Sequence, residues 1–508
     1  MKKFFIYISR TTLYVTMIAV VSLSQMHAAI RFTNNDPWPM FSTENPLAMY
    51  TFWKQCEPEQ HGALSVTVFR QNADAGKNGP FFEGTCVDAP DSCTSCIKVC
   101  DTDVPIGDIH GRWNMIALLY PEANGNTCIS TKLINALELN VDGANGVTGQ
   151  TAIDNALRYI LNPSNRDQEH NLGFFSVPIK YRKYGVRVQA ELGSYCGLGF
   201  RVQAGVATIR QDADFDDKTC SANGIACGTG TSSAACTVNQ PSCDVKTLVI
   251  NGIMKKREIV ADVLGLNIRN FCETDLEEVT LSMYWTRCFE YNAETTNACW
   301  PWFTLAPYFI GEVSIPASNK CQDNNVLFSL PFGNGRHVGA GFTGGFNVNF
   351  VETIQLGFEV GFMHFSKELY ANYPVATNNF QNGMLSRKAD LCIQPDNTWT
   401  FAATMGASEF IDCLSAYVQY RLIHHCEDCL SIKNVISNCT PNTPPFDAAS
   451  VDLEQMIHKT PWVSSFVDVH FDYDITKNIA LGFLWQGPVA QEFAYRPTTV
   501  MGSVIVKY

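Results

Sequence analysis

The chain ends in the stretch T-V-M-G-S-V-I-V-K-Y, from Thr499 to Tyr508. Side chains of a strand alternate between its two faces. One face therefore carries Val, Gly, Val, Val and Tyr, and the other carries Thr, Met, Ser, Ile and Lys. The first face is apolar or small throughout, and the last residue is aromatic. A transmembrane β-barrel needs such a closing strand, because one face meets lipid and an aromatic ring lies at the membrane–water boundary. A secreted soluble β-protein could also end in this way.

The same alternation recurs along the chain in adjacent pairs of stretches of about ten residues, which is the length that crosses a bilayer when tilted. The pairs are Gly185–Gly193 with Gly197–Arg210, Arg336–Asn349 with Ile354–Phe365, and Val463–Asp474 with Ile479–Gln486. In each stretch one face is apolar and the other is polar or small. Counting the weaker stretches as well, the sequence predicts an all-β transmembrane antiparallel barrel of roughly 12–16 strands.

Composition fits this class and excludes others. Hydrophobic residues make up 46% of the 508 residues and charged residues only 17%. After the N-terminus there is no apolar run of about 18 residues, so the sequence predicts no membrane-spanning helix. A net charge of −13 argues against a nucleic-acid partner, which would need a basic patch. A secreted β-sandwich would have a similar composition.

The N-terminus predicts a secretory signal peptide over residues 1–29. Basic residues precede an apolar core at Leu13–Leu23, and small residues follow it at Ala28 and Ala29. The alternative is a membrane anchor, but the apolar core is short and a cleavage-like site follows it. We expect a single outer-membrane barrel domain over residues 30–508.

Between the strands, short turns alternate with long polar loops that hold most of the 20 cysteines. An even cysteine count in an exported chain predicts disulfides, here as clips within long loops. Ser366–Thr398 reads as one such loop, and Asn334-Gly335 predicts a tight hairpin between Leu327–Pro331 and Arg336–Asn349. Thr151–Leu161 and Ala448–His458 predict short loop helices.

The signal peptide, the hairpin D-Y-D-I-T-K-N-I-A-L-G-F over Asp472–Phe483 and the terminal aromatic strand resemble Gram-negative outer-membrane β-barrel proteins of the porin type. The many cysteines are similar to those of the disulfide-linked chlamydial major outer-membrane porin. The resemblance implies an outer-membrane location, contact with its lipid, and insertion by the barrel assembly machinery through the C-terminal strand. The resemblance does not decide whether the protein forms a homo-oligomer.

In a barrel the polar faces line the interior. This predicts a pore lining of charged and amide side chains, namely Arg187, Glu191, Arg201, Glu359, Gln419, Arg421, Asp468, His470 and Asp472. Trp485 and Tyr508 are predicted membrane anchors on the opposite face.

Three patterns suggest other chemistry. Gly107–Gly111 reads G-D-I-H-G, like the first metal motif of metallophosphoesterases, but no partner motif follows. The spacing of His424, His425, Cys426 and Cys429 suits zinc, although disulfides compete for these thiols in an exported chain. His470 between two aspartates could serve a serine hydrolase, but a position on the lumen wall explains it more simply. We expect no metal, no cofactor and no enzymatic activity.

The sequence thus predicts a porin-like channel for passive diffusion of small hydrophilic solutes. One alternative is a disulfide-cross-linked structural or adhesive envelope protein. Another is a transporter of hydrophobic substrates, which a short N-terminal segment without room for a large plug disfavours.

Overall fold

The computed structural model describes the chain in segments. These are residues 62–73, 109–112, 174–177, 179–193, 197–213, 216–217, 270–291, 303–317, 332–334, 336–350, 354–375, 387–411, 413–436, 451, 453–457, 460–492 and 494–508. The expected signal peptide, residues 1–29, and the expected helix at Thr151–Leu161 lie outside these segments. Within them, no helix is long and apolar enough to cross a membrane.

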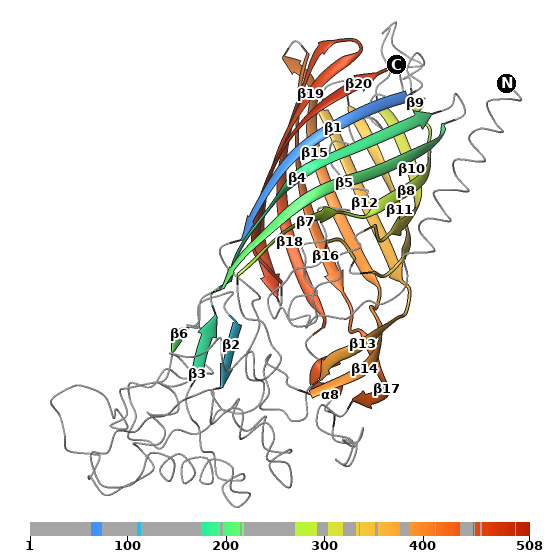
Figure 1. Cartoon of the computed structure of the whole chain (residues 1–508). Helices are drawn as coiled ribbons and strands as arrows, with labels where there is room; N and C mark the ends of the chain where they lie inside the picture. The colour runs from blue at the N-terminus through green and yellow to red at the C-terminus, as the bar shows by residue number, and fades with distance from the viewer. Residues whose placement is uncertain are drawn as a thin grey trace, which may run out of the picture.

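Antiparallel strands form one closed barrel (Figure 1). Its ring contains, in order, β1 (Gly62–Ala73), β4 (Ile179–Gly193), β5 (Leu198–Ala213), β8 (Val279–Thr286), β10 (Phe303–Ile315), β11 (Gly339–Phe350), β12 (Ile354–Phe365), β15 (Thr398–Ile411), β16 (Leu414–His425), β18 (Trp462–Thr476), β19 (Ile479–Glu492) and β20 (Pro497–Lys507). Two further strands of the same sheet, β7 (Phe271–Leu276) and β9 (Phe289–Tyr291), lie outside the ring path, which leaves 12 strands in the ring. This confirms the expected all-β barrel.

The ring closes between its first and last strands. In the register of β1 and β20, Val66 pairs with Val504 and Leu64 pairs with Val506. Beyond the last paired residues, the amide of Tyr508 donates to the carbonyl of Gly62 at 3.0 Å, and the amide of Gly62 donates back at 3.0 Å. The stretch Thr499–Tyr508 is therefore the closing strand that its alternation predicts, and the ring has no free edge at this seam.

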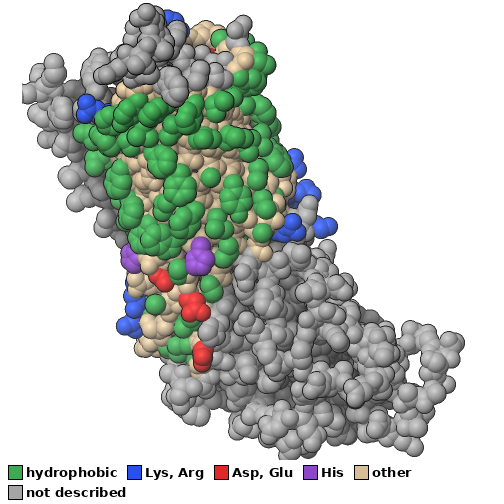
Figure 2. Space-filling view, turned by 180° about the vertical axis from the view of Figure 1, so that it is seen from behind, with side chains coloured by type: hydrophobic (Ala, Val, Ile, Leu, Met, Phe, Trp, Pro, Cys, Tyr) green, Lys and Arg blue, Asp and Glu red, His purple; other side chains and the backbone are tan. Residues whose placement is uncertain are grey.

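The two faces of the wall differ as the alternation predicts. On β20, Val500, Val504 and Val506 are 41–46% exposed on the outside, whereas Met501 and Ile505 are buried on the inside. Figure 2 shows that apolar side chains cover the outer face in a broad band, with charged side chains below it. An apolar outer band around a closed ring of hydrogen-bonded strands is the architecture of a transmembrane β-barrel.

Connections differ between the two ends of the barrel. Four connections at one end are tight: β4 to β5, β11 to β12, β15 to β16, and β18 to β19. The other end carries the long connections, as between β1 and β4 and between β5 and β7. We call these the short-turn end and the long-loop end. The C-terminus lies at the short-turn end, shown by the C label in Figure 1.

The long-loop end carries a second sheet that the sequence did not predict (Figure 1). It consists of β13 (Glu368–Val375), β14 (Arg387–Gln394) and β17 (Cys429–Ile436). The reading of Ser366–Thr398 as one loop is therefore wrong. The register slips between Tyr370 and Tyr373, and this irregularity hides the alternation of β13. Both tyrosines belong to a small apolar core of the sheet.

Near this sheet lies a short helix, α8 (Leu453–Ile457), inside the predicted stretch Ala448–His458. A third small sheet joins β2 (Ile109–Arg112), β3 (Phe174–Val177) and β6 (Asp216–Asp217).

The hairpin predicted at Asn334-Gly335 assigns the wrong pairing partner to β11. The segment Leu327–Pro331 lies outside the described residues, and β11 pairs with β10 on one side and β12 on the other. Both edges of β11 are thus occupied within the wall, so no further strand can join it. The turn signal falls in the connection between β10 and β11, where Arg336 has a φ of 89°.

Candidate functional site

All nine predicted lining residues have side chains on the inner face of the wall. Each is 0–3% exposed: Arg187, Glu191, Arg201, Glu359, Gln419, Arg421, Asp468, His470 and Asp472. These charges therefore pack against protein groups and do not stand free in bulk solvent. They form four groups, each held by neighbouring strands.

The first group pairs β4 with β5. Glu191 and Arg201 lie opposite each other in the register, and Nε of Arg201 lies 3.5 Å from Oε2 of Glu191. The guanidinium of Arg201 also lies 5.7 Å from the ring centre of Tyr284 on β8, within the range of a cation–π contact. Alternation puts both residues on inner positions of adjacent strands, and the register places them opposite each other.

The second group contains residues that the sequence reading missed. β5 pairs with β7 as far as Leu276 and with β8 from Thr280, so the strand formed by β7 and β8 holds one extra residue relative to β5. This β-bulge turns two consecutive residues, Glu277 and Glu278, into the interior, where both are buried. A pair of glutamates inside an otherwise alternating stretch is the signal that could have revealed the bulge.

Glu277 holds two cations of β4. Its carboxylate accepts from Nε of Arg187 at 3.0 Å and lies 3.2 Å from Nζ of Lys183. Glu278 accepts from Ser314 on β10 and from the backbone amide of Asn334. The bulge thus joins β4 to β10 across the inner face.

The third group lies on β16 and β18. Nη2 of Arg421 donates to Oε1 of Gln419 at 2.6 Å and lies 3.4 Å from Oδ2 of Asp468. At the next inner position along β18, Nε2 of His470 lies 3.1 Å from Oδ1 of Asp472. Each of these charges has an opposite or titratable partner in the wall, so His470 forms part of a polar ladder.

The fourth group is formed by Glu359 on β12. The hydroxyl of Tyr308 on β10 donates to Oε2 of Glu359 at 2.5 Å. To reach it, the phenol ring passes over Gly345 of β11, where a Cβ would lie 2.6 Å from the Tyr308 oxygen. A glycine is therefore required at this point of the wall.

A tyrosine ring lies over a glycine at two other places in the wall. Inward tyrosines lie on glycines that face them in the register, in the pairs Tyr284 with Gly199, Tyr308 with Gly345, and Tyr417 with Gly406. All three tyrosines are buried. Rings that lie flat on glycines cover exposed backbone and project little into the interior.

The predicted anchors lie on the outer face. Trp485 is 41% exposed and Tyr508 is 56% exposed. Trp485 lies within β19 and pairs with Val500, whereas Tyr508 lies at the short-turn end. The two aromatic side chains therefore sit at different depths of the wall.

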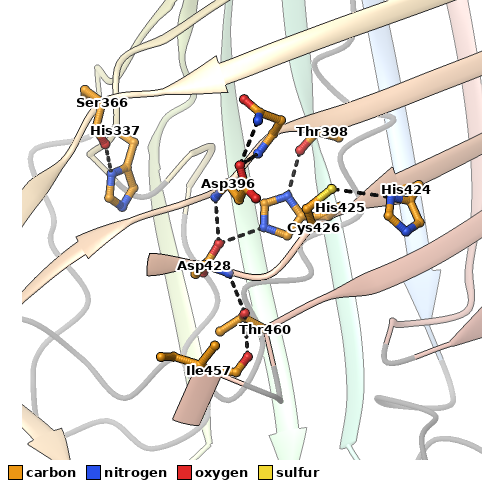
Figure 3. A network of polar contacts seen from close by, with 11 residues as sticks. His337, Ser366, Asp396, Thr398, His424, His425, Cys426, Asp428, Ile457 and Thr460 are labelled. Atoms are coloured by element: carbon orange, nitrogen blue, oxygen red, sulfur yellow. Dashed lines mark hydrogen bonds and ion pairs between the residues drawn. The ribbon is translucent and has the colours of Figure 1, made fainter. Parts of the chain in front are cut away.

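A polar junction at the long-loop end joins the second sheet to the barrel (Figure 3). Nδ1 of His425 lies 2.8 Å from the hydroxyl of Thr398, and Nε2 lies 2.9 Å from Oδ1 of Asp428. The ring of His425 stacks on Trp462 with centroids 5.6 Å apart. The order of hydroxyl, imidazole and carboxylate is that of a hydrolase, but Thr398 is only 2% exposed, and we regard the junction as structural.

The zinc-like cluster does not converge on one point. His425 points to Asp428, whereas Nδ1 of His424 lies 3.7 Å from Sγ of Cys426 on the exposed side. Cys426 and Cys429 are free thiols. Among the described residues, no three His, Cys, Asp or Glu side chains could hold a metal. Asp108 of the G-D-I-H-G motif lies outside the described residues.

Cys426 lies just beyond β16, outside the membrane-spanning part of the wall. Burial raises the pKa of its thiol above the ordinary value, and the negative charge of Asp396 raises it further. A thiol of raised pKa is a poor nucleophile at neutral pH, which argues against a role of this Cys–His pair in catalysis.

No family model and no curated protein matches the chain. Among solved structures, it is similar to an outer-membrane channel from Pseudomonas putida F1, with 7% identity and a TM-score of 0.40 over 88% of this chain and 96% of that one. The NanC porin is similar with 8% identity and a TM-score of 0.24, over 64% of this chain and 94% of that one. The transport unit of the autotransporter AIDA-I from Escherichia coli has 8% identity and a TM-score of 0.31, over 89% and 91%. Because these identities and scores are low, a functional argument has to come from the geometry of this barrel.

Proposed function

We propose that the protein is a channel of a bacterial outer membrane through which small hydrophilic solutes diffuse passively. One observation carries the proposal: polar atoms on the inner wall are buried yet have no protein partner. They include Oε1 of Gln189, Nε2 of Gln203, Oδ1 of Asn347 and Oγ of Ser503.

Such atoms need water. A buried polar atom without a hydrogen bond costs about 1–3 kcal/mol. Native proteins satisfy nearly all such groups, either with protein or with ordered water. Gln189 and Gln203 face each other on β4 and β5, beside the Glu191–Arg201 pair, so the unsatisfied positions lie among the charges of the wall. Hydration of this inner face supports an aqueous path.

The burial of the wall charges favours small solutes. Arg421 is 0% exposed and Asp468 is 1% exposed, so inner side chains pack closely at rest. Barrels of about eight strands are filled by side chains, whereas those of 16–18 strands hold wide channels. A ring of 12 strands lies between these limits, which favours ions and small polar molecules over larger solutes.

The orientation follows from the connections. In bacterial barrels the short turns face the periplasm and the long loops face outward. On this basis β20 and Tyr508 end at the periplasmic side, and the sheet formed by β13, β14 and β17 faces outward. Insertion would use the barrel assembly machinery acting on the closing strand, after removal of the expected signal peptide.

The test is reconstitution in planar bilayers. Folding is verified first by a heat-dependent shift in gel mobility, and addition of the folded protein should then give stepwise conductance. Proteoliposomes should swell in small sugars and more slowly in larger ones. A folded, inserted protein without conductance steps and without swelling would refute the proposal.

A second candidate is a structural or adhesive envelope role, which the outward sheet at the long-loop end favours. The thiols of Cys413 and Cys429 are free and exposed. If the protein is cross-linked in the envelope, non-reducing gels of intact cells should show high-mass species that collapse on reduction. Monomers under both conditions would argue against this role.

A further inference from the structure

The inner wall carries more acids than bases. Its buried carboxylates are Glu191, Glu277, Glu278, Glu312, Glu359, Asp468 and Asp472, and its buried bases are Lys183, Arg187, Arg201, Arg421 and Lys507. Seven carboxylates against five bases leave a net charge of −2 on these buried residues, with the histidines counted as neutral, and the partly buried Asp474 beside Lys507 adds one more negative charge. A permeating ion therefore meets a negative interior.

Each of these bases lies beside a carboxylate, which reduces the positive potential that the base creates in the interior. Lys183 and Arg187 share Glu277, Arg201 lies against Glu191, and Arg421 lies against Asp468. At the seam, Nζ of Lys507 donates to Oδ1 of Asp474 at 2.9 Å. Anions would find each of these cations already beside a carboxylate.

Glu359 has a different setting. A neutral phenol, Tyr308, donates a hydrogen bond to its Oε2 atom, and two glycines lie beside it on the inner face. Gly345 lies opposite it on β11, and Gly357 lies two positions before it on β12. Side chains of the neighbouring strands cover both glycines: the Tyr308 ring lies over Gly345 and the Asn347 side chain lies over Gly357, so both flank the Glu359 carboxylate.

A second side-chain oxygen, from Asn347, lies on the same inner face as Glu359. Asn347 pairs with Gly357, and its side chain is 3% exposed and lies over that glycine. Its Oδ1 atom has no hydrogen-bond partner. In the register Asn347 and Glu359 are diagonal neighbours on one face of an antiparallel pair, a spacing at which side chains can act on a common ligand.

We propose that the channel prefers cations, and that Glu359 and Asn347 form the point where a permeating monovalent cation exchanges part of its hydration shell for protein oxygens. This rests on the proposed channel function. Carboxylate and amide oxygens are the ligands that hard cations take, and carboxylates on a pore wall select for cations. The Tyr308 hydrogen bond holds the Glu359 carboxylate in position, and Oδ1 of Asn347 supplies a second oxygen on the same face.

The test is the reversal potential of the full-length protein in planar bilayers under a KCl gradient. The wild-type channel should be more permeable to K⁺ than to Cl⁻. E359Q removes one charge and should lower the K⁺/Cl⁻ permeability ratio by about fivefold, the effect of a unit charge at about 4 Å in water. The matched control is E454Q, because Glu454 is an exposed residue of α8, outside the barrel wall, and its ratio should match that of the wild type.

Two more variants keep the proposal testable if E359Q does not fold. N347A should lower K⁺ conductance, and E312Q should lower the permeability ratio, since Glu312 is also on the inner wall. Stepwise conductance with a wild-type ratio at or below one would overturn the preference and leave the channel function standing. An unchanged ratio in folded E359Q, or an unchanged K⁺ conductance in folded N347A, would overturn the contact point, and an unchanged ratio in E312Q would count against a negative wall as the source of the preference. Absence of conductance from folded wild-type protein would overturn both proposals.

Discussion

Nε of Arg187 lies 3.0 Å from Oε2 of Glu277, and both side chains are buried inside the barrel wall. The two residues come from strands that are not neighbours, since β5 lies between β4 and the bulge that carries Glu277. Gly205 of β5 allows the contact, because a Cβ there would lie 2.5 Å from Glu277 Oε2 and 2.9 Å from Cγ of Arg187. A small residue on the middle strand lets an ion pair form across it.

Replacement of Glu277 by Gln should destabilise the barrel strongly. The variant leaves Lys183 and Arg187 buried without their shared carboxylate, and loss of one partner of a buried ion pair costs about 3–5 kcal/mol. Urea unfolding in detergent or lipid, followed by tryptophan fluorescence, measures the loss. The exposed variant E290Q should unfold like the wild type. An equal midpoint for E277Q would show that the bulge carries little of the stability.

Replacement of Gly199 by Ala should also destabilise the barrel. The added Cβ would overlap the ring of Tyr284, and such overpacking costs about 1–3 kcal/mol. G311A is the matched control, because the added Cβ would meet only the carbonyl oxygen of Met283, at 4.0 Å. Its unfolding midpoint should stay close to that of the wild type. Equal losses in the two variants would contradict a specific role of the Tyr284 contact, because Gly-to-Ala replacement by itself restricts the unfolded chain and does not destabilise.

An arginine in place of Val68 should oppose membrane insertion. Val68 is 57% exposed on the outer face of β1, between residues that face the interior. Arginine on the lipid face costs about 2–4 kcal/mol near the bilayer midplane and about 0–1 kcal/mol near the interface. Y508R, at the end of the closing strand, is the interfacial control. Folding into liposomes of defined thickness measures both, and equal yields would contradict an apolar band at Val68.

The thiol of Cys426 should react slowly at neutral pH. Its raised pKa leaves less thiolate at pH 7 than an ordinary cysteine has, so alkylation should reach half its maximal rate at a higher pH than for a free thiol peptide. Burial is the larger cause, so D396N should shift this midpoint down only in part. Mass spectrometry of the alkylated peptide gives the rate. A midpoint at or below that of the peptide would contradict the raised pKa.

Much of the wall could be predicted from alternation. The period of two placed the side chains of Arg187, Glu191 and Arg201 on one face, and the structure places them inside. Alternation works here because lipid requires one apolar face and the interior accepts polar groups. It failed at Ser366–Thr398, where a register slip breaks the period of β13.

Features that depend on the neighbouring strand could not be predicted. Nothing near Glu277 in the sequence indicates that it will meet Lys183, which lies more than ninety positions earlier in the chain. Similarly, the requirement for glycine at Gly345 comes from Tyr308, which reaches across it to Glu359. Such contacts follow from register, which a single strand does not encode.

The sequence by itself determined that Thr499–Tyr508 is a strand with one face for lipid, because the face of each residue is set by its parity within the strand. Only the tertiary structure decided that this strand closes the ring against β1 and that the wall contains 12 strands. Closure depends on which distant strands pair and in what register. Those choices are made by contacts between segments hundreds of residues apart, such as Val66 with Val504.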